Sequence, residues 1–225
     1  MKRIPEEELM DSKEQARAYA DEDYSGPHDA FISYFKSRFP EFIQGNILDL
    51  GCGPADITIR FAQAFPDTDI IGLDGSEEML SIGIEDVTTR GLADQVTLKK
   101  CLLPDDALPP HNFDTIISNS LLHHLADPTV IWQTIKRCAN PGASIFIMDL
   151  MRPESTDEAN KLVELYASDA PPILKTDFYN SLLAAYQIDE VKKQLTHAGL
   201  DNLNIEVVSD RHLIVWGTME KSLPH

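Results

Sequence analysis

Short apolar runs alternate with longer amphipathic segments along the chain from residue 46 onward. The apolar runs predict five strands, at 46–50, 69–73, 96–99, 113–119 and 143–150. The amphipathic segments predict helices at 55–64, 76–90 and 127–138, the last with Asp127 as N-cap and Pro128 as first helical residue. This alternation is typical of strand and helix units around a parallel sheet.

The pattern changes after residue 150, where a loop around Arg152 leads into another predicted helix. Its buried face would be formed by Leu162, Leu165 and Tyr166. The Pro171-Pro172 pair breaks this helical pattern, because proline cannot continue a helix.

The end of the chain predicts one helix and two strands. The helix, with Asp189 as N-cap and Gly199 as its stop, is indicated by three apolar residues at helical spacing: Val191, Leu195 and Ala198. The strands, at 203–208 and 212–217, are joined by three residues, which is too short for a parallel crossover and fits a hairpin. One edge of the sheet should therefore contain an antiparallel strand.

The segment before the first strand predicts two helices. Residues 6–20 are polar and helix-prone, whereas Phe31, Phe35 and Phe39 recur every four residues and predict a buried stripe. We expect residues 1–45 to form a helical cap on one main domain, residues 46–225. A chain of 225 residues that is 43% hydrophobic is long enough for one core of its own.

Charge and cysteine content narrow the possible partners. The chain has 19 basic and 37 acidic residues, a net charge of −18, which opposes binding to nucleic acid. The glutamates at 6–8 do not fit a signal peptide, and no apolar run is long enough for a membrane helix, so we expect a cytoplasmic protein with no membrane contact. The three cysteines form no CxxC pair, so we expect neither disulfides nor a bound metal.

A glycine turn, Gly51-Cys52-Gly53, follows the first predicted strand and precedes a helix. Glycines at such a turn let the backbone come close to a ligand. The dinucleotide-binding fingerprint has a third glycine three positions after the second, but here that position is Asp56. A carboxylate at the start of the helix opposes a pyrophosphate, so a ligand without phosphate fits better.

Two more acids end strands beside this turn. Asp49 lies at the end of the first strand, and Asp74 ends the second, 23 residues after Gly51, near the spacing at which a carboxylate receives ribose hydroxyls. A nucleoside with positive charge and no phosphate would satisfy Asp49, Asp56 and Asp74 together. S-adenosylmethionine, with its sulfonium and ammonium groups, is such a ligand.

Three runs in order, at 48–54, at 72–76 with Met79, and at 113–119, resemble the class I S-adenosylmethionine-dependent methyltransferases. The resemblance covers residues 44–150 by motif and the rest by element order. It implies an α/β, Rossmann-like fold: a seven-stranded, mostly parallel sheet with one antiparallel strand next to an edge and helices on both faces. It also implies methyl transfer from S-adenosylmethionine, here to a small molecule, with S-adenosylhomocysteine as the second product.

The resemblance also assigns roles in cofactor binding. Gly51 and Gly53 would admit the methionine part, Asp49 would orient it, and Asp74 would accept both ribose hydroxyls. The other expected cofactor contacts are Cys52, Asp56, Gly75, Ser76, Met79, Cys101, Leu102, Asn119 and Ser120. Many relatives have an acid for the adenine amino group after the third strand. Here the backbone of Cys101 and Leu102, or the Asp105 carboxylate, would replace it.

Adjacent histidines, His123 and His124, follow the fourth strand and are the candidate catalytic residues. In a helical turn neighbouring side chains point about 100° apart, so we expect only one to face the cavity. It would act as a base for an acceptor with a proton to lose. Asp149 flanks the fifth strand's end and is a candidate contact; the expected substrate-binding residues are Tyr19, Tyr24, His28, Arg152, Tyr179 and Asn180.

Two other interpretations of the cofactor motifs remain open. An enzyme of the same fold could use S-adenosylmethionine for chemistry other than methyl transfer, or a noncatalytic module could bind it to regulate a partner protein. The nucleophilic atom of the acceptor is likewise open, as is the choice between monomer and homodimer.

Overall fold

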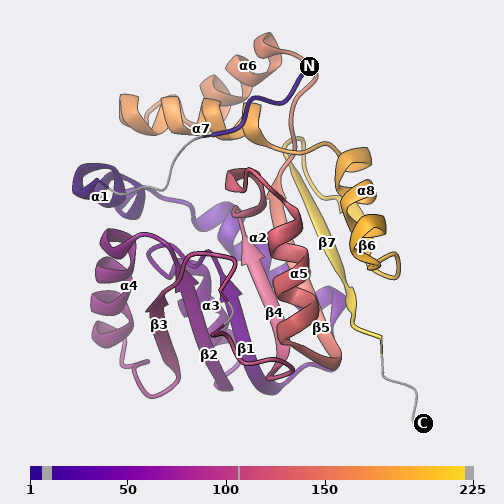
Figure 1. Ribbon diagram of the computed structural model, residues 1–225. Coiled ribbons are helices and arrows are strands. Elements are labelled where there is room, and N and C mark those ends of the chain that lie inside the picture. The colour runs from indigo at the N-terminus through magenta and orange to yellow at the C-terminus, as the bar shows by residue number, and fades with distance from the viewer. Residues whose placement is uncertain (7–11, 106, 221–225) are drawn as a thin grey trace.

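The computed structural model describes residues 1–6, 12–105 and 107–220. In this part of the chain a single sheet has the order β3-β2-β1-β4-β5-β7-β6 (Figure 1). Its strands are β1 (Gln44–Leu50), β2 (Asp67–Asp74), β3 (Val96–Lys100), β4 (Phe113–Asn119), β5 (Ala139–Leu150), β6 (Asn204–Val207) and β7 (His212–Thr218). All neighbours are parallel except that β7 runs antiparallel to β5 and to β6. The expected hairpin and the seven-stranded, mostly parallel sheet are confirmed.

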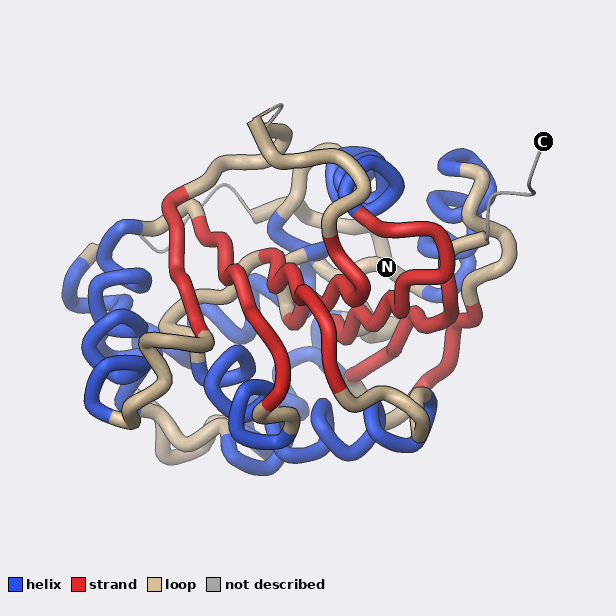
Figure 2. The backbone as a smooth tube through the Cα atoms, turned by 90° about the horizontal axis from the view of Figure 1, so that it is seen from below, coloured by secondary structure: helices blue, strands red, loops and turns tan. Residues whose placement is uncertain are grey.

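Helices cover both faces of this sheet (Figure 2). They are α1 (Lys13–Asp21), α2 (Ser25–Arg38), α3 (Asp56–Ala64), α4 (Glu77–Thr89), α5 (Thr129–Cys138), α6 (Thr156–Tyr166), α7 (Pro172–Ala184) and α8 (Ile188–Ala198), with a short 3₁₀ helix η1 (Leu122–His124). The core on one face contains apolar residues of α5 and α8, and the core on the other contains those of α2 and α3. No described helix is long and apolar enough to cross a membrane.

The N-terminal helices lie in different surroundings. Phe31 and Phe35 of α2 are fully buried, and the Phe31 ring meets Phe146 of β5 edge-on at 4.9 Å between centroids. Phe39, the third member of the predicted stripe, is only partly buried at the end of α2. Helix α1 instead contacts α4 and α7, near the carboxyl ends of the strands (Figure 1). Residues 7–11 of the helix predicted over 6–20 lie outside the described residues.

The starts of α5 and α8 differ from the prediction by one or two residues. Helix α5 begins at Thr129, because the Asp127 side chain accepts from the Thr129 backbone N–H at 2.9 Å and Pro128 takes the N-cap position. Helix α8 has Gln187 as N-cap in a capping box with Glu190, so the prediction of Asp189 was wrong. Gly199, at φ 66°, ends α8 as predicted.

The region between β5 and α8 departs most from the prediction. Helix α6 buries Leu162 as predicted, together with Ala159 and Val163. Leu165 is 65% exposed and Tyr166 45% exposed, so the prediction of these two on the buried face was wrong. Helix α7 was not predicted, although Pro172 is its first residue, a position that proline favours. Helices α6 and α7 pack together over the carboxyl ends of the strands (Figure 1), where the α6 face that is buried contacts α7.

Candidate functional site

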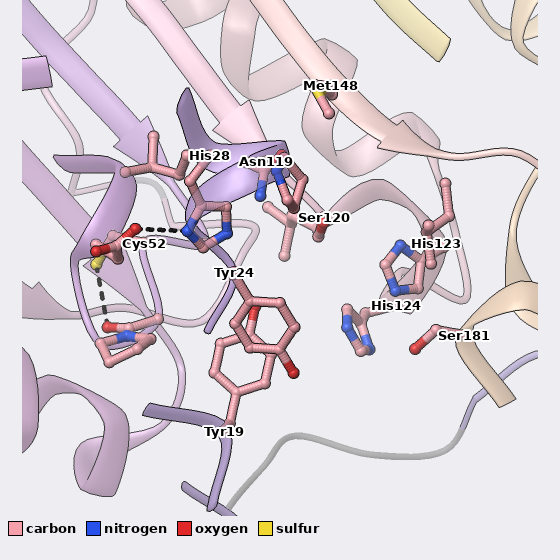
Figure 3. A pocket seen from close by; sticks show the side chains of 18 of the residues that line it. Tyr19, Tyr24, His28, Cys52, Asn119, Ser120, His123, His124, Met148 and Ser181 are labelled. Atoms are coloured by element: carbon pink, nitrogen blue, oxygen red, sulfur yellow. Dashed lines mark hydrogen bonds and ion pairs between the residues drawn. The ribbon is translucent and has the colours of Figure 1, made fainter. Parts of the chain in front are cut away.

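A cavity of about 780 Å³ is lined by the carboxyl ends of β1, β2 and β4 (Figure 3). We call the part lined by residues within 49–57, 73–79 and 101–103 the glycine half. The part lined by residues within 119–125, 148–150, 166–181 and 208–212 is the histidine half. Tyr19 and Tyr24 lie between Cys52 and His124 in Figure 3, so the two tyrosines stand between the halves.

Most of the residues predicted for a site come together in this cavity. The lining includes Tyr19, Tyr24, His28, Asp49, Gly51, Cys52, Gly53, Asp56, Asp74, Gly75, Ser76, Met79, Cys101, Leu102, Asn119, Ser120, His123 and His124. Of the residues expected to bind the cofactor or the substrate, three do not line it: Arg152, Tyr179 and Asn180. The two other candidates, Asp105 and Asp149, do not line it either.

Two glycines with a left-handed backbone conformation form the glycine turn. Gly51 has φ 71° and Gly53 has φ 53°, which other residues adopt only at a cost. A Cβ on Gly51 would lie 2.9 Å from the Leu121 Cβ, whereas one on Gly53 would meet no atom within 4 Å. Gly51 is thus required by packing, and Gly53 leaves open space on the cavity side.

Asp74 is held at the end of β2 by backbone donors. Its Oδ2 accepts from the Gly53 N–H at 2.8 Å, and its Oδ1 accepts from the Ser76 N–H at 2.8 Å. This carboxylate therefore joins the glycine turn to the start of α4. A carboxylate offers about four lone-pair sites, so such a group can accept several hydrogen bonds at once.

Asp49 is a buried acid beside the same turn. It is 1% exposed, and its Oδ2 accepts from the Thr58 hydroxyl at 2.6 Å. Burial raises the pKa of Asp49 to about 7; the Thr58 hydrogen bond opposes that rise, and the nearby charge of Asp74 adds to it. A cationic group in the cavity would favour the ionised form of Asp49.

Asp56 does not present the free carboxylate that the sequence led us to expect. Its Oδ2 lies 2.6 Å from Arg60 Nε and 2.5 Å from His28 Nδ1. Although burial opposes it, these two partners hold the pKa of Asp56 down at about 2. Arg60 lies one helical turn after Asp56, and this i,i+4 spacing was visible in the sequence. The charge of Asp56 is therefore matched within the protein.

An aromatic row links the N-terminal helices to the cavity. The Tyr19 and Tyr24 rings are 4.8 Å apart between centroids, and the Tyr24 and His28 rings are 5.6 Å apart. Burial, together with the charges of Asp56 and Asp74, raises the pKa of Tyr19 to about 12. Burial also raises the pKa of Tyr24. Both phenols therefore stay neutral at physiological pH.

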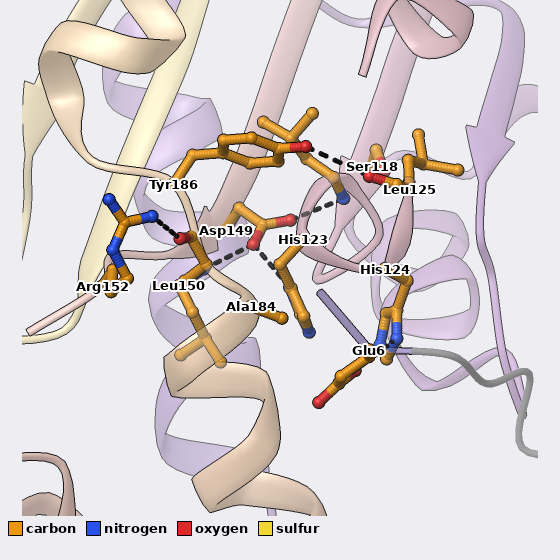
Figure 4. A network of polar contacts seen from close by, with 12 residues as sticks. Glu6, Ser118, His123, His124, Leu125, Asp149, Leu150, Arg152, Ala184 and Tyr186 are labelled. Carbon is orange, nitrogen blue, oxygen red and sulfur yellow. Dashed lines mark hydrogen bonds and ion pairs between the residues drawn. The ribbon is translucent and has the colours of Figure 1, made fainter. Parts of the chain in front are cut away.

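His123 is the most enclosed polar side chain of the histidine half (Figure 4). It is 2% exposed, and its Nδ1 lies 2.6 Å from Oδ1 of Asp149, itself 2% exposed. The Asp149 carboxylate also accepts from the backbone N–H groups of Leu122 and Leu150, each at 2.8 Å. Burial by itself would lower the pKa of His123, but Asp149 and Glu6 hold it above the ordinary value.

His124 also lines the cavity, so the expectation that only one histidine faces it was wrong. The two rings lie 4.1 Å apart between centroids at 35° to each other, because their side chains lean toward the same side of η1. Ser120, just before this turn, has φ 57°, an uncommon conformation for a residue with a side chain. Such strain is found most often at functional sites.

The three expected binding residues that do not line the cavity contact other parts of the protein or face the solvent. Arg152 is 4% exposed and donates to the Ala185 carbonyl at 2.8 Å and to Glu190 Oε1 at 2.9 Å. Tyr179 packs against the small core between α6 and α7, and Asn180 is exposed. The cavity face of α7 consists instead of residues at helical spacing: Leu174, Asp177, Phe178 and Ser181.

Hydrogen bonds within the protein narrow the choice of residue that could bind the adenine amino group. The Cys101 backbone N–H donates to the Asp74 carbonyl at 2.9 Å. Asp105 does not line the cavity, and its Oδ1 accepts from the Ala107 N–H at 2.8 Å. The Leu102 backbone remains available at the cavity wall.

Comparisons with known sequences agree with this geometry. The family described as "Methyltransferase domain" matches residues 44–206. An uncharacterized methyltransferase of Schizosaccharomyces pombe is 31% identical over 109 residues, which make up 44% of this chain and 37% of that protein. A ubiquinone/menaquinone biosynthesis C-methyltransferase of Shewanella halifaxensis is 23% identical over 175 residues, 73% of this chain and 69% of that protein.

The chain has the same fold as a solved structure, that of a putative S-adenosyl-L-methionine-dependent methyltransferase from Methanococcus maripaludis. The two superpose with a TM-score of 0.73 and 17% sequence identity, covering 98% of each chain. At this identity the likeness concerns the fold. The chain spans well under half the length of the Schizosaccharomyces pombe relative, since the match covers 37% of it.

Proposed function

Because this chain belongs to the methyltransferase-domain family, we propose that it transfers a methyl group from S-adenosylmethionine to a small molecule bound in the histidine half of the cavity. The observation that carries the proposal is the continuity of one cavity of about 780 Å³ across both halves. Small-molecule sites occupy roughly 300 to 1,000 Å³. With the cofactor in the glycine half, the remaining space suits a small acceptor.

The glycine half supplies the proposed cofactor contacts. Gly51 and Gly53 admit the methionine part, Asp49 attracts its ammonium, and Asp74 accepts the ribose hydroxyls. The remaining proposed contacts in this half are Cys52, Gly75, Ser76, Met79, Cys101 and Leu102. Asn119 and Ser120 of the histidine half complete the proposed set. In this arrangement the cationic cofactor also favours the ionised state of Asp49, whose burial otherwise raises its pKa.

The histidine half supplies the proposed acceptor contacts. In methyl transfer an electron pair of the acceptor would form a bond to the methyl carbon as the carbon–sulfur bond breaks, which would leave S-adenosylhomocysteine. A proton that the acceptor loses would pass to a base. The sulfonium is already an activated leaving group, so the protein contributes alignment and exclusion of water. His123 and His124 are the proposed catalytic residues, acting on the acceptor's nucleophilic atom, and Asp149 is a positioning residue that fixes the His123 ring.

The walls of the histidine half favour an acceptor with an apolar body. Apolar residues from several elements contribute: Leu121, Leu125, Met148, Leu150, Leu174 and Phe178. The quinone-pathway methyltransferase named above as a relative is consistent with such an acceptor. A net charge of −18 makes a nucleic acid a poor acceptor. Tyr19 of α1 and Tyr24, which directly precedes α2, are the proposed cap over the acceptor.

The test is production of S-adenosylhomocysteine from S-adenosylmethionine in the presence of fractionated small metabolites, with methyl-labelled cofactor to find the product. We expect label in a molecule small enough to pass a dialysis membrane. Label found only in protein or nucleic acid would contradict the proposal. Cofactor binding without label in any fraction would favour the noncatalytic module instead.

A further inference from the structure

Three metal-ligating side chains meet at the base of the histidine half. Glu6 comes from the N-terminal segment, and His123 and His124 come from η1; one ligand atom of each lies within 4.8 Å of the others (Figure 4). The side chains are largely enclosed, with exposed fractions of 12% for Glu6, 2% for His123 and 26% for His124. Both histidines line the cavity, so the cluster is reached from it.

The contact between Glu6 and His124 is close but poorly aligned for a hydrogen bond. His124 Nδ1 lies 2.7 Å from Glu6 Oε2. This Nδ1 is nevertheless buried without a hydrogen bond of acceptable geometry in the described part of the chain. An ion bound here would replace this contact and move the two atoms slightly apart, since imidazole nitrogen and carboxylate oxygen are both metal ligands.

His123 has the partner that metal-binding histidines usually have. A ligating imidazole commonly donates its other ring N–H to a carboxylate, which fixes the tautomer and the ring orientation. His123 Nδ1 lies 2.6 Å from Asp149 Oδ1, and the same oxygen accepts from the Leu150 N–H at 2.8 Å. Nδ1 is thus occupied, and Nε2 is the atom left to bind an ion.

The N-terminal segment that carries Glu6 is anchored beside the histidines. The Arg3 guanidinium donates to the His123 carbonyl at 2.8 Å and to the Ala184 carbonyl at 2.5 Å. The Ile4 N–H donates to the Leu183 carbonyl at 3.0 Å. Glu6 is therefore brought to the histidines by contacts that do not depend on its own carboxylate.

The geometry points to a binding site for one divalent transition-metal ion, held by Glu6, His123 and His124 with Asp149 supporting His123. Two imidazoles and one carboxylate suit Zn²⁺ and related ions such as Co²⁺ and Ni²⁺, and three protein ligands leave a coordination position open. That position would face the cavity, so an acceptor could reach the ion. The sequence led us to expect no metal, because the cysteines form no CxxC pair. No spacing motif reveals the site, since Glu6 is far from the histidines along the chain.

Calorimetric titration of the full, tag-free chain with ZnCl₂, after removal of metals by a chelator, tests the site. We expect one ion per chain. Asp149→Asn removes the residue that supports His123 and should weaken Zn²⁺ binding by roughly 10-fold to 100-fold. Glu6→Gln and His124→Ala each remove a ligand, so their Zn²⁺ affinity should fall by at least as much. The matched control is His197→Ala, which removes an exposed histidine bonded to the Lys193 carbonyl and should leave binding unchanged.

Thermal stabilisation by S-adenosylmethionine, measured on each variant, shows that the variant is folded and keeps its glycine half. Absence of Zn²⁺ binding by the original chain, or binding that is equal in Glu6→Gln, His124→Ala and the control, would overturn the metal site. Such a result together with methylation of a small molecule would leave the proposed function intact. Metal binding lost in the two variants, with no small molecule methylated, would support the metal site and contradict the proposed function.

Discussion

The two halves of the cavity are assembled in different ways. In the glycine half, Asp49, Gly51 and Gly53 are neighbours in the sequence, and Asp74 ends the adjacent strand β2. In the histidine half, His123 meets Asp149 from β5 and Glu6 from the N-terminal segment. The first half therefore depends on local sequence order and the second on long-range packing. We expect the first to determine cofactor affinity and the second to determine turnover.

The largest expected effect separates turnover from cofactor affinity. His123→Gln removes the ring that Asp149 orients and should lower turnover of the true acceptor by about 100-fold or more, whether the ring acts as an acid–base group or holds the proposed ion. Cofactor affinity, measured by calorimetry, should stay within a few fold, because the glycine half is untouched.

His124→Gln is the matched comparison, since His124 faces the same cavity but its Nδ1 lies beside Glu6, whereas that of His123 lies beside Asp149. We expect a smaller loss of turnover than for His123→Gln. If both variants keep full turnover, the histidines have no part in the chemistry. If His123→Gln abolishes cofactor binding, the two halves do not separate as proposed.

A change in the glycine half should lower cofactor affinity, which the histidine variants should leave nearly unchanged. Asp74→Asn keeps the size of the side chain but removes the charge that strengthens its bonds to hydroxyls, worth about 1.5 to 3 kcal/mol. Affinity for S-adenosylhomocysteine should fall by roughly 10-fold to 150-fold. An unchanged dissociation constant in calorimetry would mean that Asp74 only ties Gly53 to Ser76.

The difference in assembly also explains what could be predicted of the site. The glycine turn and Asp74 were found from spacing, because their geometry is set by a strand end and the next few residues. Glu6 could not be found, because it is brought to η1 by long-range contacts of residues 1–6, such as those of Arg3 with the Ala184 and His123 carbonyls. Asp56 was placed in the cavity correctly, but its charge is matched by Arg60, one turn later.

A moderate effect of pH is expected in the glycine half. The pKa of Asp49 is raised to about 7, so this carboxyl is mostly ionised at pH 8 and mostly protonated at pH 6. A cationic cofactor must displace the proton at pH 6, so affinity should fall by about tenfold from pH 8 to pH 6. Calorimetry across this range checks it, with Asp49→Asn as control. Equal pH dependence in both proteins would exclude Asp49 as its source.

The smallest effects are expected outside the cavity. Tyr179 and Asn180 lie on α7 but do not line the cavity. Asn180→Ala should change stability by about 0.5 kcal/mol or less and leave turnover and cofactor affinity unchanged. Phe178→Ala, on the cavity face of the same helix, is the contrast and should raise the KM of the acceptor. Steady-state kinetics of the two variants would refute the assigned face if Asn180→Ala gave the larger change.

Whether an element of the fold could be predicted depends on how far apart along the chain its interacting residues lie. Gly199 and the short connection between β6 and β7 act locally, so the end of α8 and the hairpin were predicted. The buried face of α6 depends on its contact with α7, which lies later in the chain, so Leu165 was wrongly placed in the core. Local signals identify elements, while their partners decide which side is buried.

The most direct test of the two-half cavity is a crystal structure of the protein with S-adenosylhomocysteine. The account predicts the ribose hydroxyls on the Asp74 carboxylate, the amino acid part against Gly51 and Gly53, and the sulfur directed toward the half that contains His123 and His124. A bound product whose sulfur faces away from both histidines, or whose ribose does not contact Asp74, would contradict it.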